Sequence, residues 1–319
     1  MYRLGIDLGG TNIVAGIIDD DFKIITKASC KTNLPRTQEE ICDSIAQLCF
    51  KVLSDANIPM EDVASVGIGV PGFGNPKTGV IYSAANFGSV KDWQITEMLQ
   101  NRLNKKVIIE NDANAAAFGE FLAGSAKGST NAIAVTLGTG VGGGIIIDGK
   151  IFGGSGYSGA ELGHMVIQKD GQPCGCGRKG CWESYSSATA LIRMTKEAIE
   201  SEGRENSFMF KLAGGDMNNV DGKTAFDAQQ AGDATGTAVV EKYLDYLACG
   251  VANLLFIFQP DVICIGGGVS KQGDNIIIPL RERLQNEVCT LKFFETKICA
   301  ATLGNDAGLI GAAFLDKLY

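Results

Sequence analysis

Two segments of the chain combine glycines with carboxylate or hydroxyl side chains in a spacing that suits phosphate. The first, Asp7-Leu8-Gly9-Gly10-Thr11-Asn12, places a carboxylate at the end of an apolar run and donors in the turn that follows. Glycines let the backbone approach phosphate oxygens and direct N–H groups at them, and a carboxylate can hold Mg²⁺ directly or through water. An ordinary hairpin with an aspartate cap explains this motif alone equally well.

The second segment, Leu137 to Gly144, contains the formal spacing G-x-G-x-x-G. A dinucleotide-binding loop would require a helix after the glycines and an acidic residue about 20 positions later. Here the apolar run Ile145–Ile147 and the hairpin signal Asp148-Gly149 follow instead,. The dinucleotide interpretation therefore fails.

A third glycine cluster, Gly266-Gly267-Gly268, follows an apolar strand and would let a flat group such as adenine or ribose lie on the backbone,. A simple strand-to-helix turn is the alternative for this cluster alone. The segment Gly222-Lys223-Thr224 lacks the upstream glycine of a P-loop, which excludes that class of nucleotide site,.

The chain's single histidine lies close in sequence to a cluster of cysteines, in the pattern His164…Cys174-Gly-Cys176…Cys181. One imidazole and three thiolates make a tetrahedral zinc set with no open position, so we expect one structural Zn²⁺. Three of the ten residues of the segment 174–183 are glycines, which let a tight loop wrap a metal. Separate core cysteines and a core histidine are the weaker alternative.

The elements that must position these groups begin with strand, glycine turn and strand. We expect Leu4–Leu8 and Ile13–Ile18 to be strands around Gly9-Gly10-Thr11,. The same order recurs about 130 residues later, where Asn131–Leu137 precedes the second turn. The recurrence predicts two similar lobes that face each other across a cleft.

Further elements follow from apolar periodicity and capping signals. We expect a helix over Thr37–Asp55 with a capping box formed by Thr37 and Glu40,. The longest apolar run, Val251 to Phe258, is predicted to be a buried helix end, and Gly308–Leu318 a closing helix.

Composition limits the partners that this chain can have. The net charge of −8 disfavours binding to nucleic acid and to anionic membranes,. No apolar run reaches the roughly 18 residues of a membrane helix, and the first residues do not resemble a secretion signal,. We therefore expect a cytoplasmic protein without nucleic-acid or membrane partners. The seven cysteines outside the cluster sit singly among apolar residues and are expected in the core,.

Taken together, the three glycine motifs resemble the phosphate 1, phosphate 2 and adenosine motifs of the sugar kinase, heat-shock protein and actin superfamily. The chain also resembles the ROK family over nearly its whole length. The resemblance is carried by Asp7 to Thr11, Gly69-Val70-Pro71-Gly72, Glu110 to Ala115, Leu137 to Gly144, Glu161 to His164 and Cys174 to Glu183.

This resemblance implies the fold and its division. The fold class is α/β, the two-lobed actin-like ATPase (ribonuclease H-like) fold with an interlobe cleft. We expect an N-terminal lobe over residues 1–113, with the helix at 304–319 packing back on it. The C-terminal lobe would cover 114–303 and contain a zinc-binding loop at 161–183.

The resemblance also implies site residues. ATP with Mg²⁺ would be bound by the following residues: Asp7, Gly9, Gly10, Thr11, Asn12, Thr139, Gly140, Gly267 and Gly268. The hexose would be bound by the following residues: Gly72, Asn86, Asn111, Asp112, Glu161, His164 and Glu183. Asp112 would be the catalytic base that accepts the hydroxyl proton, although an N-cap of the helix over Ala113–Phe121 is an equal alternative from the residues alone.

The expected function is ATP-dependent phosphorylation of a hexose, with glucose as the first choice of substrate and a homodimer or homotetramer as the assembly. Other hexoses or N-acetylhexosamines (N-acetylmannosamine, N-acetylglucosamine, allose, fructose) share the same ligand set and remain alternatives. Phe73 stands where N-acetylmannosamine kinases of the family tend to carry Arg, which disfavours an N-acyl sugar. A non-catalytic sugar-sensing regulator is the remaining alternative.

Overall fold

The computed structural model describes residues 1–84, 87–88, 91–288 and 295–319, which form two compact units. The first unit comprises Met1–Ala134, Gly144–Ala160 and Thr302–Tyr319, and the second comprises Val135–Gly143 and Glu161–Ala301. The predicted lobes are residues 1–113 with 304–319, and residues 114–303. These boundaries stay a prediction, because the two compact units are defined only by the contacts within each unit.

The first unit is built on a five-stranded sheet with the strand order β3-β2-β1-β4-β7. Its strands are β1 (Tyr2–Leu8), β2 (Asn12–Ile18), β3 (Ile24–Lys31), β4 (Val63–Val70) and β7 (Val107–Asn111). Strands β1 and β2 pair antiparallel through the first glycine turn, whereas β1, β4 and β7 run parallel. The carboxyl ends of these three parallel strands therefore meet at one edge of the sheet.

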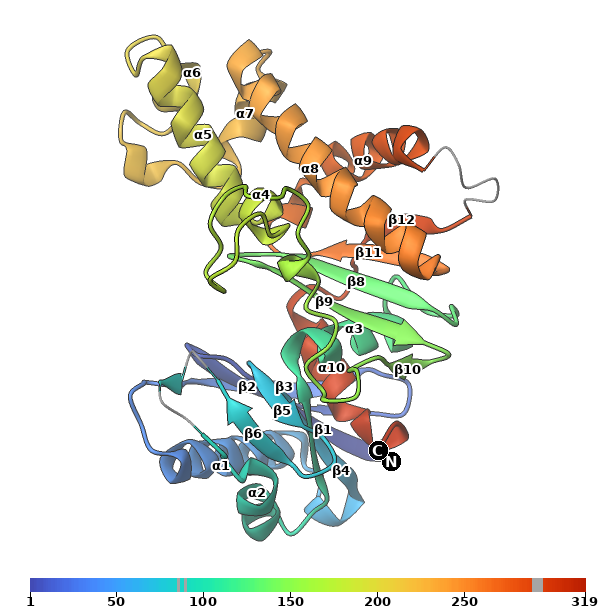
Figure 1. Cartoon of the computed structure of the whole chain (residues 1–319). Coiled ribbons are helices and arrows are strands. Elements are labelled where there is room, and N and C mark those ends of the chain that lie inside the picture. Colours follow the sequence, from blue (N-terminus) through green and yellow to red (C-terminus); the bar gives the residue numbers. More distant parts are fainter. Residues whose placement is uncertain (85–86, 89–90, 289–294) are drawn as a thin grey trace. The chain divides into compact units, whose positions relative to one another are not determined.

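Helices cover both faces of this sheet (Figure 1). One face packs against α1 (Gln38–Ala56), while α3 (Asp112–Ala123) and α10 (Ala307–Ala313) lie together on the other. The remaining short elements of the unit are α2 (Ile95–Leu103), β5 (Phe73–Asn75), β6 (Val80–Ser83) and β10 (Lys150–Ile151).

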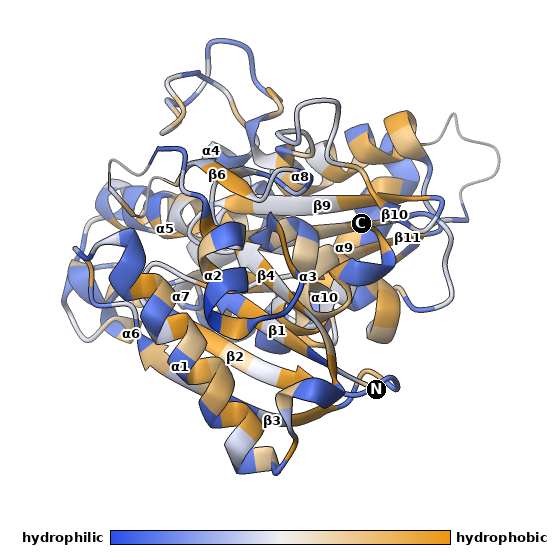
Figure 2. Cartoon of the chain, turned by 90° about the horizontal axis from the view of Figure 1, so that it is seen from below, coloured by the Kyte–Doolittle hydropathy of each residue, from blue (hydrophilic) through white to orange (hydrophobic). Residues whose placement is uncertain are grey.

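Helix α1 shows how the sequence specifies one of these elements. The Thr37 hydroxyl accepts a hydrogen bond from the backbone N–H of Glu40, and the Glu40 carboxylate accepts one from the backbone N–H of Thr37, which confirms the predicted capping box,. Figure 2 shows α1 as alternating hydrophobic and hydrophilic stretches. Most of its apolar residues, among them Ile45 and Val52, are buried in the core of the unit, whereas Phe50 is 48% exposed.

A second sheet has the strand order β10-β9-β8-β11-β12, which repeats the order of the first sheet position by position. Its further strands are β8 (Ala132–Leu137), β9 (Val141–Ile147), β11 (Val262–Gly266) and β12 (Lys297–Ala300). The boundary between the two compact units passes through β8 and β9. Asp148 and Gly149 both have positive φ, so the predicted hairpin turn after β9 is confirmed,.

The helices of the second unit pack around α8 (Ala234–Phe258), which contacts its neighbours α4, α5, α7 and α9 (Figure 1). These helices are α4 (Glu183–Ser186), α5 (Ala188–Glu202), α6 (Phe208–Leu212), α7 (Thr224–Gln230) and α9 (Asp274–Glu287). Within the described residues, no helix is long and apolar enough to cross a membrane.

Two expectations about burial are wrong in part. Helix α8 ends at Phe258 as expected, but Phe256 and Ile257 are 50% and 65% exposed, because they lie on the side of the helix opposite its buried residues,. Three of the isolated cysteines, Cys30, Cys249 and Cys299, are only half-buried. Cys289 lies outside the described residues.

Candidate functional site

The first glycine turn joins β1 to β2 in a closed hairpin. The backbone N–H of Gly9 donates to the carbonyl of Asn12 at 3.0 Å, and a Cβ on Gly9 would lie 2.9 Å from that oxygen. Thr32, which is fully buried just after β3, donates its hydroxyl to the Gly9 carbonyl at 2.7 Å. Its backbone N–H donates to the Thr11 carbonyl at 2.9 Å. These bonds fix the carbonyl oxygens of Gly9 and Thr11, so that neither oxygen points toward an anion bound at the turn.

Two carboxylates lie at the edge where the parallel strands end. Asp7 of β1 is level with Gly69 of β4, which is level with Glu110 of β7, and Asp112 comes two residues later. Burial, and then the negative charge of Asp112, together raise the pKa of Asp7 to about 6,. Burial also raises the pKa of Asp112, although its side chain reaches the surface. A pair of crowded carboxylates at a strand end is a site that favours a cation or a proton.

The N-cap of α3 is Asn111 and not Asp112. The Asn111 side-chain oxygen accepts from the backbone N–H groups of Ala113 and Asn114 at 2.9 and 3.1 Å. Its amide nitrogen donates to the carbonyl of Gly72 at 3.2 Å. The capping alternative for Asp112 is therefore wrong, since its neighbour fills the cap. One N–H of Asn111 remains for a ligand, because an amide carries two.

The backbone conformation at position 72 and the space around it require glycine. Its φ is +79°, and a Cβ at this position would lie 2.2 Å from the Ser83 carbonyl,. Asn86, the other sugar residue expected from this part of the chain, lies outside the described residues.

The second glycine turn, between β8 and β9, is also fixed by hydrogen bonds to its carbonyl oxygens. The Thr189 hydroxyl donates to the Thr139 carbonyl at 2.8 Å, and the N–H of Ala188 donates to the Gly138 carbonyl at 2.8 Å. Glu183 accepts from the N–H of Val141 at 3.1 Å. A Cβ on Gly140 would lie 2.2 Å from a carboxylate oxygen of Glu183, so this glycine gives room to that carboxylate.

The third glycine cluster adjoins a cavity of the second unit. Gly267 has a φ of +88°, and a Cβ there would lie 2.5 Å from the Leu137 carbonyl. The cavity has a volume of about 530 Å³. Its lining consists of Ala188, Gly222, Lys223, Gly268, Val269, Lys271 and Gln272. The two lysines were missed from sequence, because Lys223 belongs to a segment that fails the P-loop pattern and Lys271 belongs to no motif.

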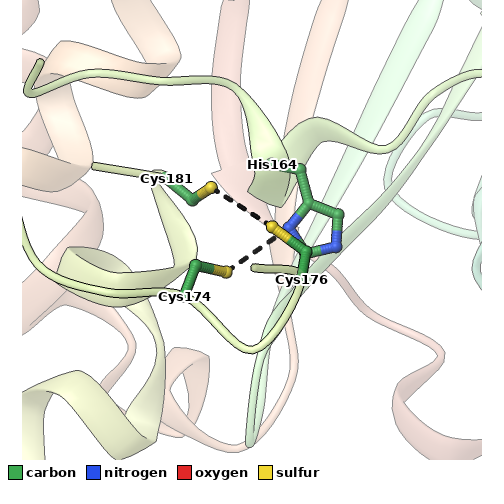
Figure 3. Close-up of side chains that lie close together, drawn as sticks. All are labelled: His164, Cys174, Cys176 and Cys181. Atoms are coloured by element: carbon green, nitrogen blue, oxygen red, sulfur yellow. Dashed lines mark hydrogen bonds between the residues drawn. The ribbon is translucent and has the colours of Figure 1, made fainter. Parts of the chain in front are cut away.

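The four predicted zinc ligands converge in the second unit (Figure 3). One ligand atom from each of His164, Cys174, Cys176 and Cys181 lies within 4.8 Å of every other. The sulfur atoms of Cys176 and Cys181 are 3.7 Å apart, and the Cys174 sulfur is 3.7 Å from Nδ1 of His164. Tetrahedral zinc with Zn–S bonds of about 2.3 Å places two sulfurs about 3.8 Å apart. The donor set and its spacing therefore fit a zinc ion.

The loop that presents these ligands is held by backbone hydrogen bonds. The N–H of Cys174 donates to the Arg178 carbonyl at 2.9 Å, and the N–H of Gly180 donates to the Gln172 carbonyl at 2.8 Å. A Cβ on Gly180 would lie 1.7 Å from the Gln168 carbonyl, so only glycine fits. Trp182, which directly follows the ligand Cys181, is fully buried.

The pKa values of two of the thiols shift in opposite directions. Burial raises the pKa of Cys181 to about 12, with the neighbouring thiols as a further cause. A hydrogen bond from the backbone of Arg178 lowers the pKa of Cys176. Metal coordination requires thiolates, so binding of a cation would release protons here.

Two sugar residues expected from sequence adjoin this cluster. His164 turns Nδ1 toward the sulfurs and its other ring nitrogen away from them (Figure 3). Glu183, the first residue of α4, lies 3.6 Å from the Cys174 sulfur. Glu161 precedes the 3-10 turn Leu162–His164 and is exposed.

A smaller cavity of about 260 Å³ links the cluster with the second turn, since Cys174, Glu183 and Thr139 all line it. Arg193 of α5 also lines this cavity, and no sequence motif marks it.

The expected site residues thus fall into two groups. The first unit holds Asp7, Gly9, Gly10, Thr11, Asn12, Gly72, Asn111 and Asp112. The second unit holds Thr139, Gly140, Glu161, His164, Glu183, Gly267, Gly268 and the three cysteines.

The chain is similar to known proteins in both sequence and structure. The sequence profile described as the ROK family matches residues 3–318. A glucokinase from Thermotoga maritima is 36% identical over 98% of this chain and 96% of its own length. A ROK family glucokinase from Streptomyces griseus, solved in complex with glucose and AMPPNP, is 33% identical with a TM-score of 0.80 and 99% of both chains covered.

A ROK hexokinase from Thermus thermophilus is 30% identical, with a TM-score of 0.82 and coverage of 98% of this chain and 97% of that chain. These likenesses and the repeated sheet confirm the two-lobed actin-like ATPase fold expected from the sequence.

Proposed function

The chain belongs to the ROK family, and on that premise we propose that it is an ATP-dependent glucokinase that converts glucose to glucose 6-phosphate. The observation that supports this most directly is the pair Asp7 and Asp112 at the carboxyl ends of β1 and β7. Asp112 is not the N-cap of α3, because Asn111 fills that position, although the Asp112 carboxylate also accepts from the N–H of Ala113 at 2.8 Å.

Asp112 is the base in this proposal. Its carboxylate accepts the proton of the sugar hydroxyl as that oxygen forms a bond to the γ-phosphorus of ATP and the bond to ADP breaks. The raised pKa of Asp112 lies closer to neutral pH than that of an ordinary aspartate. A base with such a pKa accepts a proton more readily while it is still ionised,.

Asp7 and the glycine turns hold the nucleotide. Asp7 would bind Mg²⁺, directly or through water, and the ion would supply neutralisation of the phosphate charge. The backbone N–H groups of two turns would bind phosphate oxygens, with Thr11 and Thr139 as hydroxyl donors. The nucleotide residues are Asp7, Gly9, Gly10, Thr11, Asn12, Thr139, Gly140, Gly267 and Gly268. The cavity beside Gly268 would take the adenosine end of ATP, and Lys223 and Lys271 also line it.

The sugar would be bound by the polar residues that the family resemblance implies. Asn111 has one N–H left for a hydroxyl, and Glu183 and the outward ring nitrogen of His164 offer further partners. Gly72, Asp112 and Glu161 complete the proposed set, and Asn86 stays a prediction from sequence.

A structural zinc ion would be held by Nδ1 of His164 and the three cysteine sulfurs. The ion would supply rigidity to the loop 161–183, because every one of its four positions is taken by protein. His164 and Glu183 are then positioned by the same cluster, which would connect metal binding to sugar binding.

The identity of the sugar is the most specific part of the proposal. Relatives named glucokinase support glucose. Phe73, which is 40% exposed at the start of β5, puts an apolar ring near Gly72 and offers no charge for an N-acyl group.

A coupled assay of ADP release tests this proposal. The purified protein with Mg²⁺ and ATP should turn over glucose with a higher kcat/KM than mannose, allose, fructose, N-acetylglucosamine or N-acetylmannosamine. A different preferred sugar would correct the substrate, and sugar binding without ADP release would favour a regulator. Light scattering of the same sample would test the expected homodimer or homotetramer.

A further inference from the structure

Glu110 is a buried carboxylate at the end of β7 that the proposed chemistry does not use. Its side chain is 5% exposed. One of its oxygens accepts from the N–H of Asn111 at 2.8 Å and from the side-chain amide of Asn114 at 3.1 Å. The other accepts from the hydroxyl of Tyr319 at 2.6 Å. A buried carboxylate needs such donors, so all three bonds offset the cost of burying it.

These bonds span the turn from β7 into α3. Asn111 and Asn114 lie on either side of Asp112, and both are fixed by the same carboxylate. Asn114 in turn gives its backbone N–H to the cap at Asn111. A shift of Glu110 would therefore move the base and the capping residue together.

Tyr319 is anchored along β7 at two points. Its hydroxyl reaches Glu110 at the end of the strand, and its carbonyl accepts from the Lys106 ammonium at 2.8 Å just before the strand begins. Burial, and then the charge and hydrogen bond of Glu110, raise the pKa of Tyr319. Its hydroxyl therefore stays protonated and remains a donor at neutral and mildly alkaline pH.

We propose that Tyr319 is a positioning residue for phosphoryl transfer, which acts through Glu110 to fix the β7–α3 turn that carries Asn111 and Asp112. The proposal rests on the function proposed above. A small displacement of a base relative to its substrate costs rate rather than binding, so Tyr319 should contribute mainly to kcat.

The first test is Tyr319→Phe, which removes the hydroxyl and keeps the ring. We expect kcat to fall about 5- to 20-fold and KM for ATP to stay within about twofold, because only the position of the base changes. Thr296→Val is the matched control. It removes a buried hydroxyl that donates to the Pro260 carbonyl, also at 2.6 Å, in the other compact unit. An equal loss of stability in both variants with unchanged kcat in Tyr319→Phe would overturn the proposal.

A double-mutant cycle with Glu110→Gln tests the route. If Tyr319 acts through Glu110, Tyr319→Phe should lower kcat by less than about twofold in the Glu110→Gln background. Effects of the two substitutions that multiply independently would contradict this route.

Hydrogen exchange separates failure of this proposal from failure of the proposed function. The amides of Ala113 and Asn114 should exchange about tenfold faster in Tyr319→Phe than in wild type, with no substrate present. If wild type phosphorylates no hexose, the function fails, and this measurement still decides whether Tyr319 holds the turn. Unchanged exchange at these amides would overturn the positioning role.

Discussion

The two strand–turn–strand hairpins are alike in backbone and different in charge. Each sheet places its hairpin at the same position in the same strand order. In each turn a threonine hydroxyl from elsewhere in the same unit donates to a turn carbonyl, from Thr32 to Gly9 at 2.7 Å and from Thr189 to Thr139 at 2.8 Å. In both turns this hydrogen bond fixes a carbonyl oxygen, so that the turn can present its backbone N–H groups as donors.

The difference lies in the residue before the shared Leu-Gly pair. It is Asp7 in the first turn and Thr136 in the second. Only the first turn therefore carries its own carboxylate, and that carboxylate has a raised pKa of about 6. The second turn takes its acidic neighbour, Glu183, from α4. The first turn, which carries a carboxylate, therefore suits a cation, whereas the second suits neutral donation to phosphate.

The largest expected effect tests whether the charged turn region carries the chemistry. Asp112→Asn should lower kcat by a factor on the order of 10²–10⁴ with sugar binding retained, because the amide accepts no proton. Steady-state kinetics and calorimetric titration with glucose measure the two quantities. Asp233→Asn is the matched control, since Asp233 caps α8 and asparagine caps equally well,. Near-normal turnover in Asp112→Asn would remove Asp112 from the chemistry.

The second prediction concerns Asp7, whose substitution makes the first turn neutral like the second. Asp7→Asn should lower kcat about 10²-fold, the size of loss found when one group that stabilises transition-state charge is removed. The metal-free variant should nevertheless be more stable than wild type above pH 7, by about 2 °C in Tm.

The sign of this stability effect follows from the pKa. Folding raises the pKa of Asp7 from 3.8 to about 6, so the folded state binds the proton more tightly than the unfolded state,. Wild type therefore gains stability relative to the variant as the pH falls through 6, and the difference should vanish near pH 4. Thermal melts from pH 4 to pH 8 measure it, and a variant less stable at every pH would contradict the crowding of the two carboxylates.

The third prediction tests whether Glu183, the acidic neighbour of the second turn, is positioned by the metal cluster. Cys176→Ala should lose zinc, lower Tm and raise the sugar KM about tenfold, with the ATP KM changed less. Elemental analysis and kinetics check this, and acidification should release zinc because the ligands must be deprotonated. Cys249→Ala on α8 serves as the control cysteine. Full activity of the wild-type protein without bound metal would remove both the zinc and its coupling to the sugar.

Sequence predicted the parts of this picture that depend on local pattern. The two hairpins, the capping box at Thr37 and the approach of His164 to the three cysteines all follow from residue type and spacing, and the structure confirms them. The sequence left open whether Asp112 is a base or the N-cap of α3, because aspartate and asparagine are both good capping residues and only the backbone path gives the cap to Asn111,.

Contacts between distant segments could not be predicted from the sequence. Thr32 and Thr189 lie 23 and 50 residues from the carbonyls they bind, and Tyr319 lies 209 residues from Glu110. No periodicity or motif relates such positions, since tertiary packing alone brings them together. The exposed end of α8 is a similar case, because an apolar run does not say which side of a helix is covered.

The smallest expected effect tests the device that the two turns share. Thr32→Val and Thr189→Val each remove one hydroxyl and keep the shape of the side chain, so the carbonyl of Gly9 or Thr139 is freed to turn toward phosphate. Each variant should raise the KM for ATP about two- to fourfold and leave the sugar KM unchanged. Their stabilities should differ, because Thr32 is fully buried and Thr189 is exposed. We expect a loss of about 1–2 kcal/mol for Thr32→Val and less than about 0.5 kcal/mol for Thr189→Val, as measured by denaturant unfolding. If ATP binding weakens only in Thr32→Val, in step with its lost stability, then the second hydroxyl has no part in presenting the turn, and the likeness of the two hairpins ends at the backbone.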